Sequence, residues 1–250
     1  MSELFSIQLQ NRQQSRDGVW LDLPTTTEQV QAALRQIDIS SDNPQGLFIS
    51  GYFAEEEKRF AIPYNMVLAS NVDELNFLAS RLETLSTGER AELNAALQAP
   101  QSELFSIGRI TDFPENVDYY VHLPDVRGPA QLGDYYLNRS GMVDMPEEWK
   151  GGIDTAQFGR YVAQQEQGVF TEYGYLVKSG DAWQKVHEDQ SVPEEYRVLS
   201  FPAPEVLRDS ANISPPVQPE TEPQKVIPII LNGKDSAERM KEITDRLETG

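Results

Sequence analysis

The spacing of apolar residues changes several times along the first 70 residues. Residues 19–23 read Val-Trp-Leu-Asp-Leu, an alternation that predicts a short strand. Residues 25–37 open with capping-box spacing at 25–28 and continue with apolar residues at helical intervals, so they predict a helix. A second strand is predicted at 46–52, and a third strand or extended stretch at 60–67. We therefore expect an N-terminal α+β subdomain over residues 1–70.

Residues 71–100 carry helical periodicity throughout. Leucines recur every three or four residues after a cap signal formed by Asn71 and Glu74. A second cap signal, Ser86 with Glu89, begins another helix, so the pattern predicts a helical subdomain made of a helix pair. The acids that fall off the apolar stripe of these helices, and that we expect to face water, are Asp73, Glu83 and Glu92.

Residues 101–200 return to mixed structure and predict a second α+β subdomain. The predicted strands cover residues 107–111, 118–123, 173–177 and 196–199. The predicted helices begin near Ala130, Asp144 and Asp154. The hexapeptide Ser-Glu-Leu-Phe-Ser-Ile occurs at 2–7 and again at 102–107, and it suggests a duplicated strand that opens both mixed subdomains, although the flanking residues do not agree.

The last 50 residues differ in composition from the rest. Seven prolines and few apolar residues predict an extended linker over 201–228. Within residues 229–250, Asp235 and Glu238 have cap spacing and precede an apolar face at Met240, Ile243 and Leu247. This terminal amphipathic helix needs a partner surface to be stable. The overall expectation is an elongated α+β chain with three small consecutive subdomains, a Pro-rich linker and a terminal helix.

Charge narrows the classes of function. The 250 residues hold 40 Asp and Glu against 21 Lys and Arg, a net charge of -19, and no cysteine. Residues 1–100 contribute -7, residues 101–200 contribute -9 and residues 201–250 contribute -3, so the acidity is distributed over the predicted folded part. This distribution argues against direct binding of nucleic acid or of membranes and favours basic protein partners, with solubility as the simpler explanation.

The absence of cysteine, of an apolar stretch long enough for a membrane span and of a secretory signal predicts a cytoplasmic protein. Catalytic chemistry has little support. The two histidines, His122 and His187, stand in no metal-binding spacing, and neither a nucleophile elbow nor a phosphate-binding glycine loop is present. We expect no cofactor, no metal and no enzymatic activity, although a hydrolase that uses His122 stays open.

Several motifs then resemble one family. Residues 18–24, Gly-Val-Trp-Leu-Asp-Leu-Pro, are similar to the start of the ArdA antirestriction proteins. Residues 146–149 (Pro-Glu-Glu-Trp), 153–161 (Ile-Asp-Thr-Ala-Gln-Phe-Gly-Arg-Tyr) and 168–175 (Gly-Val-Phe-Thr-Glu-Tyr-Gly-Tyr) resemble the C-terminal part of that family. The resemblance covers about residues 18–178. The last 25 residues or so look like the opening of an ArdC-type domain, which leaves open that the chain is part of a larger multidomain protein.

The resemblance implies a protein of conjugative, mobile genetic elements. ArdA-like proteins are elongated and acidic, dimerise through their C-terminal part, and imitate bent DNA in the groove of type I restriction–modification enzymes. It therefore implies that carboxylates stand in for phosphates against such an enzyme, or against another DNA-binding protein with a basic groove, and that the chain forms a homodimer. The carboxylates that we expect to form this surface are Asp73, Glu74, Glu83, Glu89, Glu92, Asp118, Asp125, Asp134, Asp144, Glu147, Glu148, Asp154, Glu166 and Glu172.

Two simpler interpretations of these carboxylates and of the chain are also open. Asp144, Asp154, Glu74 and Glu89 can be helix caps, with or without a role in binding. The whole chain can instead be an acidic adaptor of a mobile element that docks a partner through its body or through its terminal helix.

Overall fold

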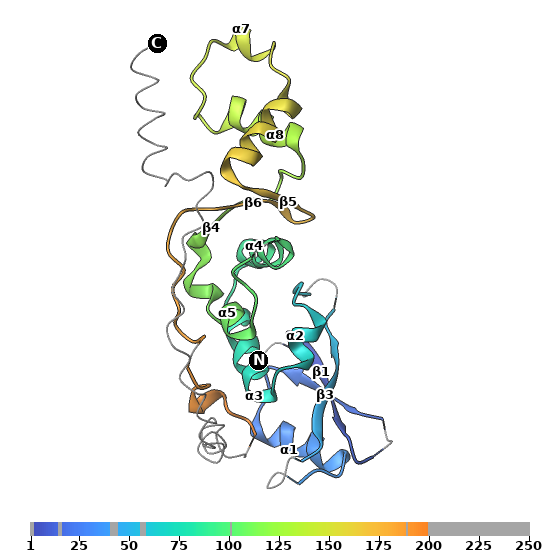
Figure 1. Cartoon of the computed structure of the whole chain (residues 1–250). Coiled ribbons are helices and arrows are strands. Elements are labelled where there is room, and N and C mark those ends of the chain that lie inside the picture. Colours follow the sequence, from blue (N-terminus) through green and yellow to red (C-terminus); the bar gives the residue numbers. More distant parts are fainter. Residues whose placement is uncertain are drawn as a thin grey trace, which may run out of the picture. The chain divides into compact units, whose positions relative to one another are not determined.

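The computed structural model describes residues 3–14, 17–40, 45–55, 59–100, 102–188 and 190–199, and the structural statements below concern these residues. The chain divides into one unit, Met1–Pro202, and a second, Ala203–Gly250. The described residues belong to the first unit, which combines helices with two antiparallel sheets (Figure 1) and confirms the α+β class. The predicted linker at 201–228 and terminal helix at 229–250 lie outside the described residues. The division at residues 70 and 100 stays a prediction.

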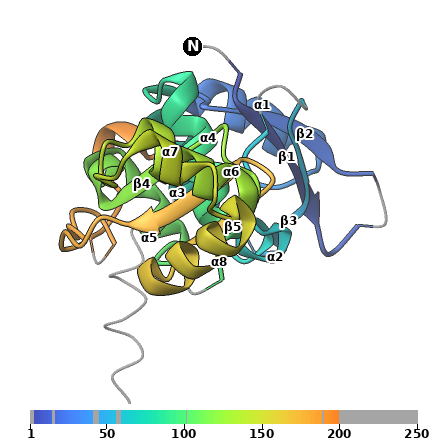
Figure 2. The ribbon, with the colours of Figure 1, turned by 90° about the horizontal axis from the view of Figure 1, so that it is seen from above.

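The first sheet contains β1 (Phe5–Asn11), β2 (Val19–Leu23) and β3 (Leu47–Phe53). Strand β1 lies in the middle and is antiparallel to both neighbours (Figure 2). Side chains alternate between two faces, so the inner face of the sheet is apolar and the outer face is polar and aromatic. Helix α1 (Thr27–Gln36) follows β2, and its capping box joins Thr26 to Gln29, one residue later than predicted.

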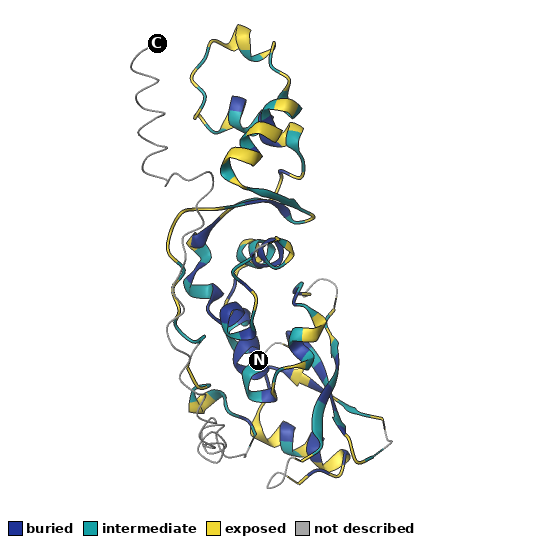
Figure 3. Ribbon diagram, viewed as in Figure 1, coloured by how far each residue is buried: buried dark blue, intermediate teal, exposed yellow. Residues whose placement is uncertain are grey.

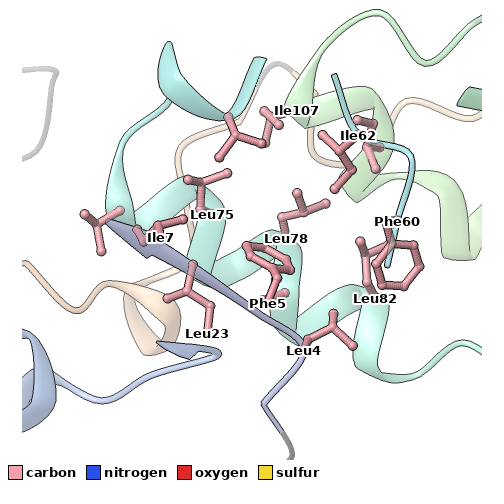
Figure 4. Packing of buried hydrophobic residues seen from close by; sticks show 14 of the residues in the cluster. Leu4, Phe5, Ile7, Leu23, Phe60, Ile62, Leu75, Leu78, Leu82 and Ile107 are labelled. Atoms are coloured by element: carbon pink, nitrogen blue, oxygen red, sulfur yellow. The ribbon is translucent and has the colours of Figure 1, made fainter. Parts of the chain in front are cut away.

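The helices within residues 64–98, which we call the middle part, cover the inner face of this sheet. They are α2 (Tyr64–Leu68), α3 (Val72–Glu83) and α4 (Thr87–Gln98), and both predicted capping boxes of α3 and α4 are confirmed. In Figure 4 the leucines Leu75, Leu78 and Leu82 of α3 gather with Phe5 and Ile7 of β1. The stripe of leucines therefore forms the centre of one large core.

The second sheet has the order β4-β6-β5 and is formed by β4 (Tyr120–Leu123), β5 (Val169–Thr171) and β6 (Gly174–Lys178). Between β4 and β5 the chain forms α6 (Pro129–Asp134), the π-helical turn η4 (Tyr135–Arg139), α7 (Glu147–Lys150) and α8 (Thr155–Glu166). The helices expected near Ala130 and Asp154 are confirmed. Asp144 does not cap α7, because that helix begins only after Pro146.

Two glycines explain the close packing of α6 against α8. A Cβ atom on Gly133 would collide with the carbonyl oxygen of Thr155, and one on Gly159 would collide with that of Pro129. The two backbones therefore touch where side chains would normally separate them. A small second cluster, Val126, Leu132, Ala163 and Tyr175, completes this part of the molecule.

The strand predicted at 107–111 is wrong. These residues form the helix α5 (Ile107–Thr111), because Ser106 caps it by accepting the amide of Arg109 at 3.2 Å. Two 3-10 turns, η2 (Phe113–Glu115) and η3 (Val117–Tyr119), connect α5 to β4. The repeated hexapeptide is consequently no duplicated strand: its first copy runs into β1, and its second copy leads into α5.

The strand predicted at 196–199 is also wrong, and the stretch at 60–67 is extended only as far as Pro63, where α2 begins. The chain at 194–196 forms the 3-10 turn η5 (Glu194–Tyr196). In both places a side-chain oxygen accepts a backbone amide that the carbonyl of a neighbouring strand would otherwise accept. Asn94 accepts the amide of Ala61 at 2.8 Å, and Asp73 accepts the amide of Val198 at 2.7 Å. A pattern of apolar residues cannot distinguish this pairing from a strand.

Candidate protein-binding surface

Three of the expected surface carboxylates sit at the beginnings of helices. Glu74 and Glu89 occupy the third position of α3 and α4, where each completes a capping box. Asp154 caps α8 by accepting the amide of Gln157 at 2.9 Å. All three lie where the exposed amides and the dipole of a helix favour negative charge. All three therefore help to begin a helix. Asp154 is also exposed to solvent.

Asp73 is half-buried rather than facing water as expected. Its Oδ1 accepts the amides of Val198 and Leu199 at 2.7 and 2.9 Å, and burial raises its pKa although both hydrogen bonds act in the opposite direction. Asp73 therefore attaches α3 to the return segment, which we define as residues 179–188 and 190–199. In Figure 1 this segment runs in orange from β6 back past α5 and α3.

Glu92 is likewise half-buried, and the expectation that it faces water is wrong. Burial raises its pKa to about 8, with further contributions from the negative charges of Glu89 and Asp118. Its Oε1 is shielded from solvent and has no hydrogen-bond partner among the described residues. At neutral pH this carboxyl group therefore holds a proton and adds little negative charge to the surface.

The carboxylate of Glu166 accepts hydrogen bonds from two tyrosines. The hydroxyls of Tyr136 and Tyr175 both donate to it, the latter at 2.9 Å, and join α8 to η4 and β6. Burial, followed by the adjacent Glu166 carboxylate, raises the pKa of both tyrosines, which therefore stay protonated as donors. Glu166 therefore stabilises the packing of α8 against η4 and β6.

Two more of the expected residues have local partners. Asp134 accepts hydrogen bonds from Asn138 at 2.8 Å and Arg139 at 2.6 Å, and these two groups lower its pKa. Glu172 lies in the turn between β5 and β6 and accepts a hydrogen bond from Gln98 of α4. Neighbouring side chains thus already bond both oxygens of Asp134 and one oxygen of Glu172.

The remaining expected carboxylates are mostly exposed. Glu83, at the end of α3, is half-exposed. Five more are exposed and lie within residues 101–199, which we call the third part: Asp118, Asp125, Asp144, Glu147 and Glu148. Of these, Glu147 forms an ion pair with Lys150 at 2.6 Å. Asp118 also lines a polar pocket together with Glu115 and Asp181, so carboxylates gather there from η2, η3 and the return segment. Figure 3 shows α7 and its flanking loops as largely exposed.

Sequence reasoning missed the buried charges that hold the return segment. Asp112 is fully buried and accepts the amides of Val186, His187 and Glu188 at 3.2, 2.6 and 3.3 Å. Arg109 is buried and lies 2.8 Å from Glu188 and 3.3 Å from Glu103. The role of Asp112 cannot be predicted from local sequence patterns, because the amides that it accepts are more than 70 residues away.

The histidine left open as a catalytic residue has a structural partner. His122 Nε2 is 2.9 Å from the carbonyl oxygen of Tyr173, and burial lowers the pKa of the ring. Among the described residues, no group of three potential ligands is placed to hold a metal ion, and no helix is long and apolar enough to cross a membrane. What the described residues show is a set of separate, exposed carboxylates.

Exposed carboxylates on a small α+β scaffold define a protein whose surface is suited to a basic partner. A comparison with protein families identifies the family within this class. The model of the family described as antirestriction protein (ArdA) matches residues 14–177. The chain belongs to the ArdA family of antirestriction proteins and is therefore an antirestriction protein. No curated protein matches the sequence.

Proposed function

We propose that this antirestriction protein is a DNA mimic that inhibits type I restriction–modification enzymes by occupying their DNA-binding groove. The observation that carries the proposal is the set of exposed carboxylates in the third part: Asp118, Asp125, Asp144, Glu147 and Glu148. They lie within the residues matched by the family model. A groove that binds DNA carries cations spaced for phosphates, and separated carboxylates on a folded surface offer it the same kind of charge.

The structure supports a smaller mimic surface than the sequence implied. Glu92 is mostly uncharged at neutral pH, and Asp73 and Glu166 are occupied by internal hydrogen bonds. We infer that the middle helices serve chiefly as a scaffold, and that the third part carries most of the phosphate-like charge. Asp154 joins this surface, because capping α8 still leaves it exposed.

We further propose that the active form is a homodimer joined through the third part. Three large apolar side chains, Met142, Trp149 and Tyr161, are 76%, 69% and 59% exposed within about 20 residues of chain. Large apolar side chains that are exposed close together in the sequence are typical of contact surfaces. A dimer would double the net charge of -19 to -38 and give the mimic two-fold symmetry like that of a bipartite DNA site.

The proposed function is tested with the purified full chain against a panel of type I enzymes. The expected result is inhibition of DNA binding and cleavage, competitive with DNA and weaker at high salt, because charge pairing and counterion release drive the contact. Full DNA binding and cleavage by every enzyme of the panel, at a large excess of the protein, would refute the proposal. A cytoplasmic location is part of the same proposal, since the target acts on DNA in the cytoplasm.

A further inference from the structure

An aromatic pair lies on the outer face of the first sheet, whose strands carry none of the residues assigned to the mimic surface. Trp20 of β2 and Phe53 of β3 are 50% and 57% exposed, and their rings meet edge to face with centroids 6.5 Å apart. The neighbours of Trp20 in β2, Leu21 and Leu23, point into the core, so the position of the aromatic residues on the opposite face is set by strand alternation.

The register of the sheet explains how residues on its two edge strands come together. Gln8 of β1 lies opposite both Trp20 and Gly51. A Cβ atom on Gly51 would stand only 3.0 Å from the far edge of the Trp20 ring, so the indole reaches across the central strand and rests on the glycine. The absence of a side chain at residue 51 makes room for the ring, and the sheet holds it in place.

A carboxylate completes this face. Ser6 of β1 lies opposite both Asp22 and Phe53, and its hydroxyl donates to Asp22 Oδ1 at 2.6 Å. Because Asp22 is two residues after Trp20 on the same strand, both side chains point to the same exposed face. The face thus combines two aromatic rings with one oriented negative charge.

We propose that Trp20, Phe53 and Asp22 form an anchor for an arginine-bearing segment of the inhibited enzyme. A guanidinium stacks on an indole while its N–H groups pair with a carboxylate, which is a combination that an ammonium matches less well. The net charge of -7 over residues 1–100 favours a basic partner over an acidic or neutral one. This inference rests on the proposed function for the identity of the partner, and it adds a second, aromatic contact to the carboxylates of the third part.

The chemistry of the anchor is tested without any enzyme. The full chain is titrated by calorimetry with hexa-arginine and hexa-lysine at the same ionic strength. We expect hexa-arginine to bind about two- to fivefold more tightly through the rings, and we expect the W20A/F53A variant to lose this part of the preference. The F105A variant, which removes an exposed aromatic ring outside this face, is the matched control and should keep it. An arginine preference that W20A/F53A leaves unchanged would overturn the proposal.

A second measurement separates the anchor from the proposed function. Against a type I enzyme that the unmodified chain inhibits, W20A/F53A should raise the inhibitory concentration about tenfold or more, while W20F should stay within about threefold of the unmodified chain. Equal inhibition by W20A/F53A and the unmodified chain would refute the anchor and leave the DNA-mimic proposal standing. If the unmodified chain inhibits no enzyme, the DNA-mimic proposal fails, and the peptide titration still decides whether the face binds arginine.

Discussion

The middle helices and the third part carry acids at similar density but use them differently. In α3 and α4, Glu74 and Glu89 complete capping boxes, and Asp73 is bound to two backbone amides. In the third part, Asp112 and Glu166 are likewise bound internally, but Asp125 and Asp144 are exposed. The difference teaches that the net charge of a sequence does not give the charge exposed on its surface. A carboxylate that lies near unpaired hydrogen-bond donors in the fold accepts bonds from those donors and is then less available to a partner.

The largest expected effect concerns Asp112, which holds the return segment. Replacing Asp112 with alanine removes a buried acceptor from three amides at residues 186–188. We expect the free energy of unfolding to fall by about 3–5 kcal/mol, because buried donors are left unpaired. Urea unfolding monitored by circular dichroism measures the change. The control is D125A, an exposed acid, which should change stability by less than about 0.5 kcal/mol.

Asp73 should show an intermediate effect. The D73A variant loses the acceptor for the amides of Val198 and Leu199, at a site that is only half-buried. We expect a loss of about 1–3 kcal/mol in unfolding free energy and faster hydrogen exchange at residues 197–199. The D144A variant should alter neither quantity. If D73A and D144A were equally stable, the contrast between the two regions would lose its main support.

Glu92 makes stability depend on pH with a predictable sign. Its pKa is raised to about 8 in the folded chain, whereas the unfolded value is near 4.5, so the folded state binds the proton more tightly. Unfolding free energy should therefore fall as pH rises from about 4.5 to above 8. The E92Q variant cannot ionise and should be more stable than the unmodified chain by about 1–2 kcal/mol at pH 9, and about equally stable at pH 4.

This difference is obtained from urea unfolding of both proteins across that pH range. An E92Q variant whose stability tracks that of the unmodified chain at every pH would show that Glu92 is ionised and solvated, which would return it to the charged surface.

The smallest effect on stability is expected at a helix cap. The S86A variant removes the side chain that accepts the amide of Glu89 at 3.4 Å, and it should cost about 0.5–1 kcal/mol. E148A, at an exposed acid in the first turn of α7, should cost no more than a few tenths. Thermal unfolding of both variants ranks them, and a larger loss for E148A would reverse the proposed division of roles.

The sequence predicts much of this fold because local signals and core patterns agree in many places. The capping boxes of α3 and α4, the strand at 19–23 and the stripe of leucines in α3 are all found where periodicity and cap spacing put them. The errors at 107–111 and 196–199 have different causes. At 107–111 the adjacent Ser106 caps a helix, whereas at 196–199 the distant side chain of Asp73 accepts a backbone amide, so alternation is no evidence of a strand in either segment.

The surface was less predictable than the fold. The role of Glu92 depends on burial by elements distant in sequence, and that of Glu166 depends on tyrosines brought to it by η4 and β6. The aromatic face did leave a signal, since Trp20 and Asp22 alternate with Leu21 and Leu23 in a predicted strand. That alternation identifies an exposed tryptophan, but the contact with Phe53 requires the register of the sheet.

The central claim is that the exposed carboxylates of the third part carry the contact with the enzyme. The most direct test compares two quadruple variants of equal charge change in competition with DNA for one type I enzyme. D118N/D125N/D144N/E148Q neutralises the proposed surface, and E3Q/D17N/E28Q/E55Q neutralises exposed acids in residues 1–100. We expect the first to weaken binding about a hundredfold or more and the second less than about tenfold, with both folded. Equal losses in the two variants would mean that net charge alone attracts the enzyme, and would contradict the claim.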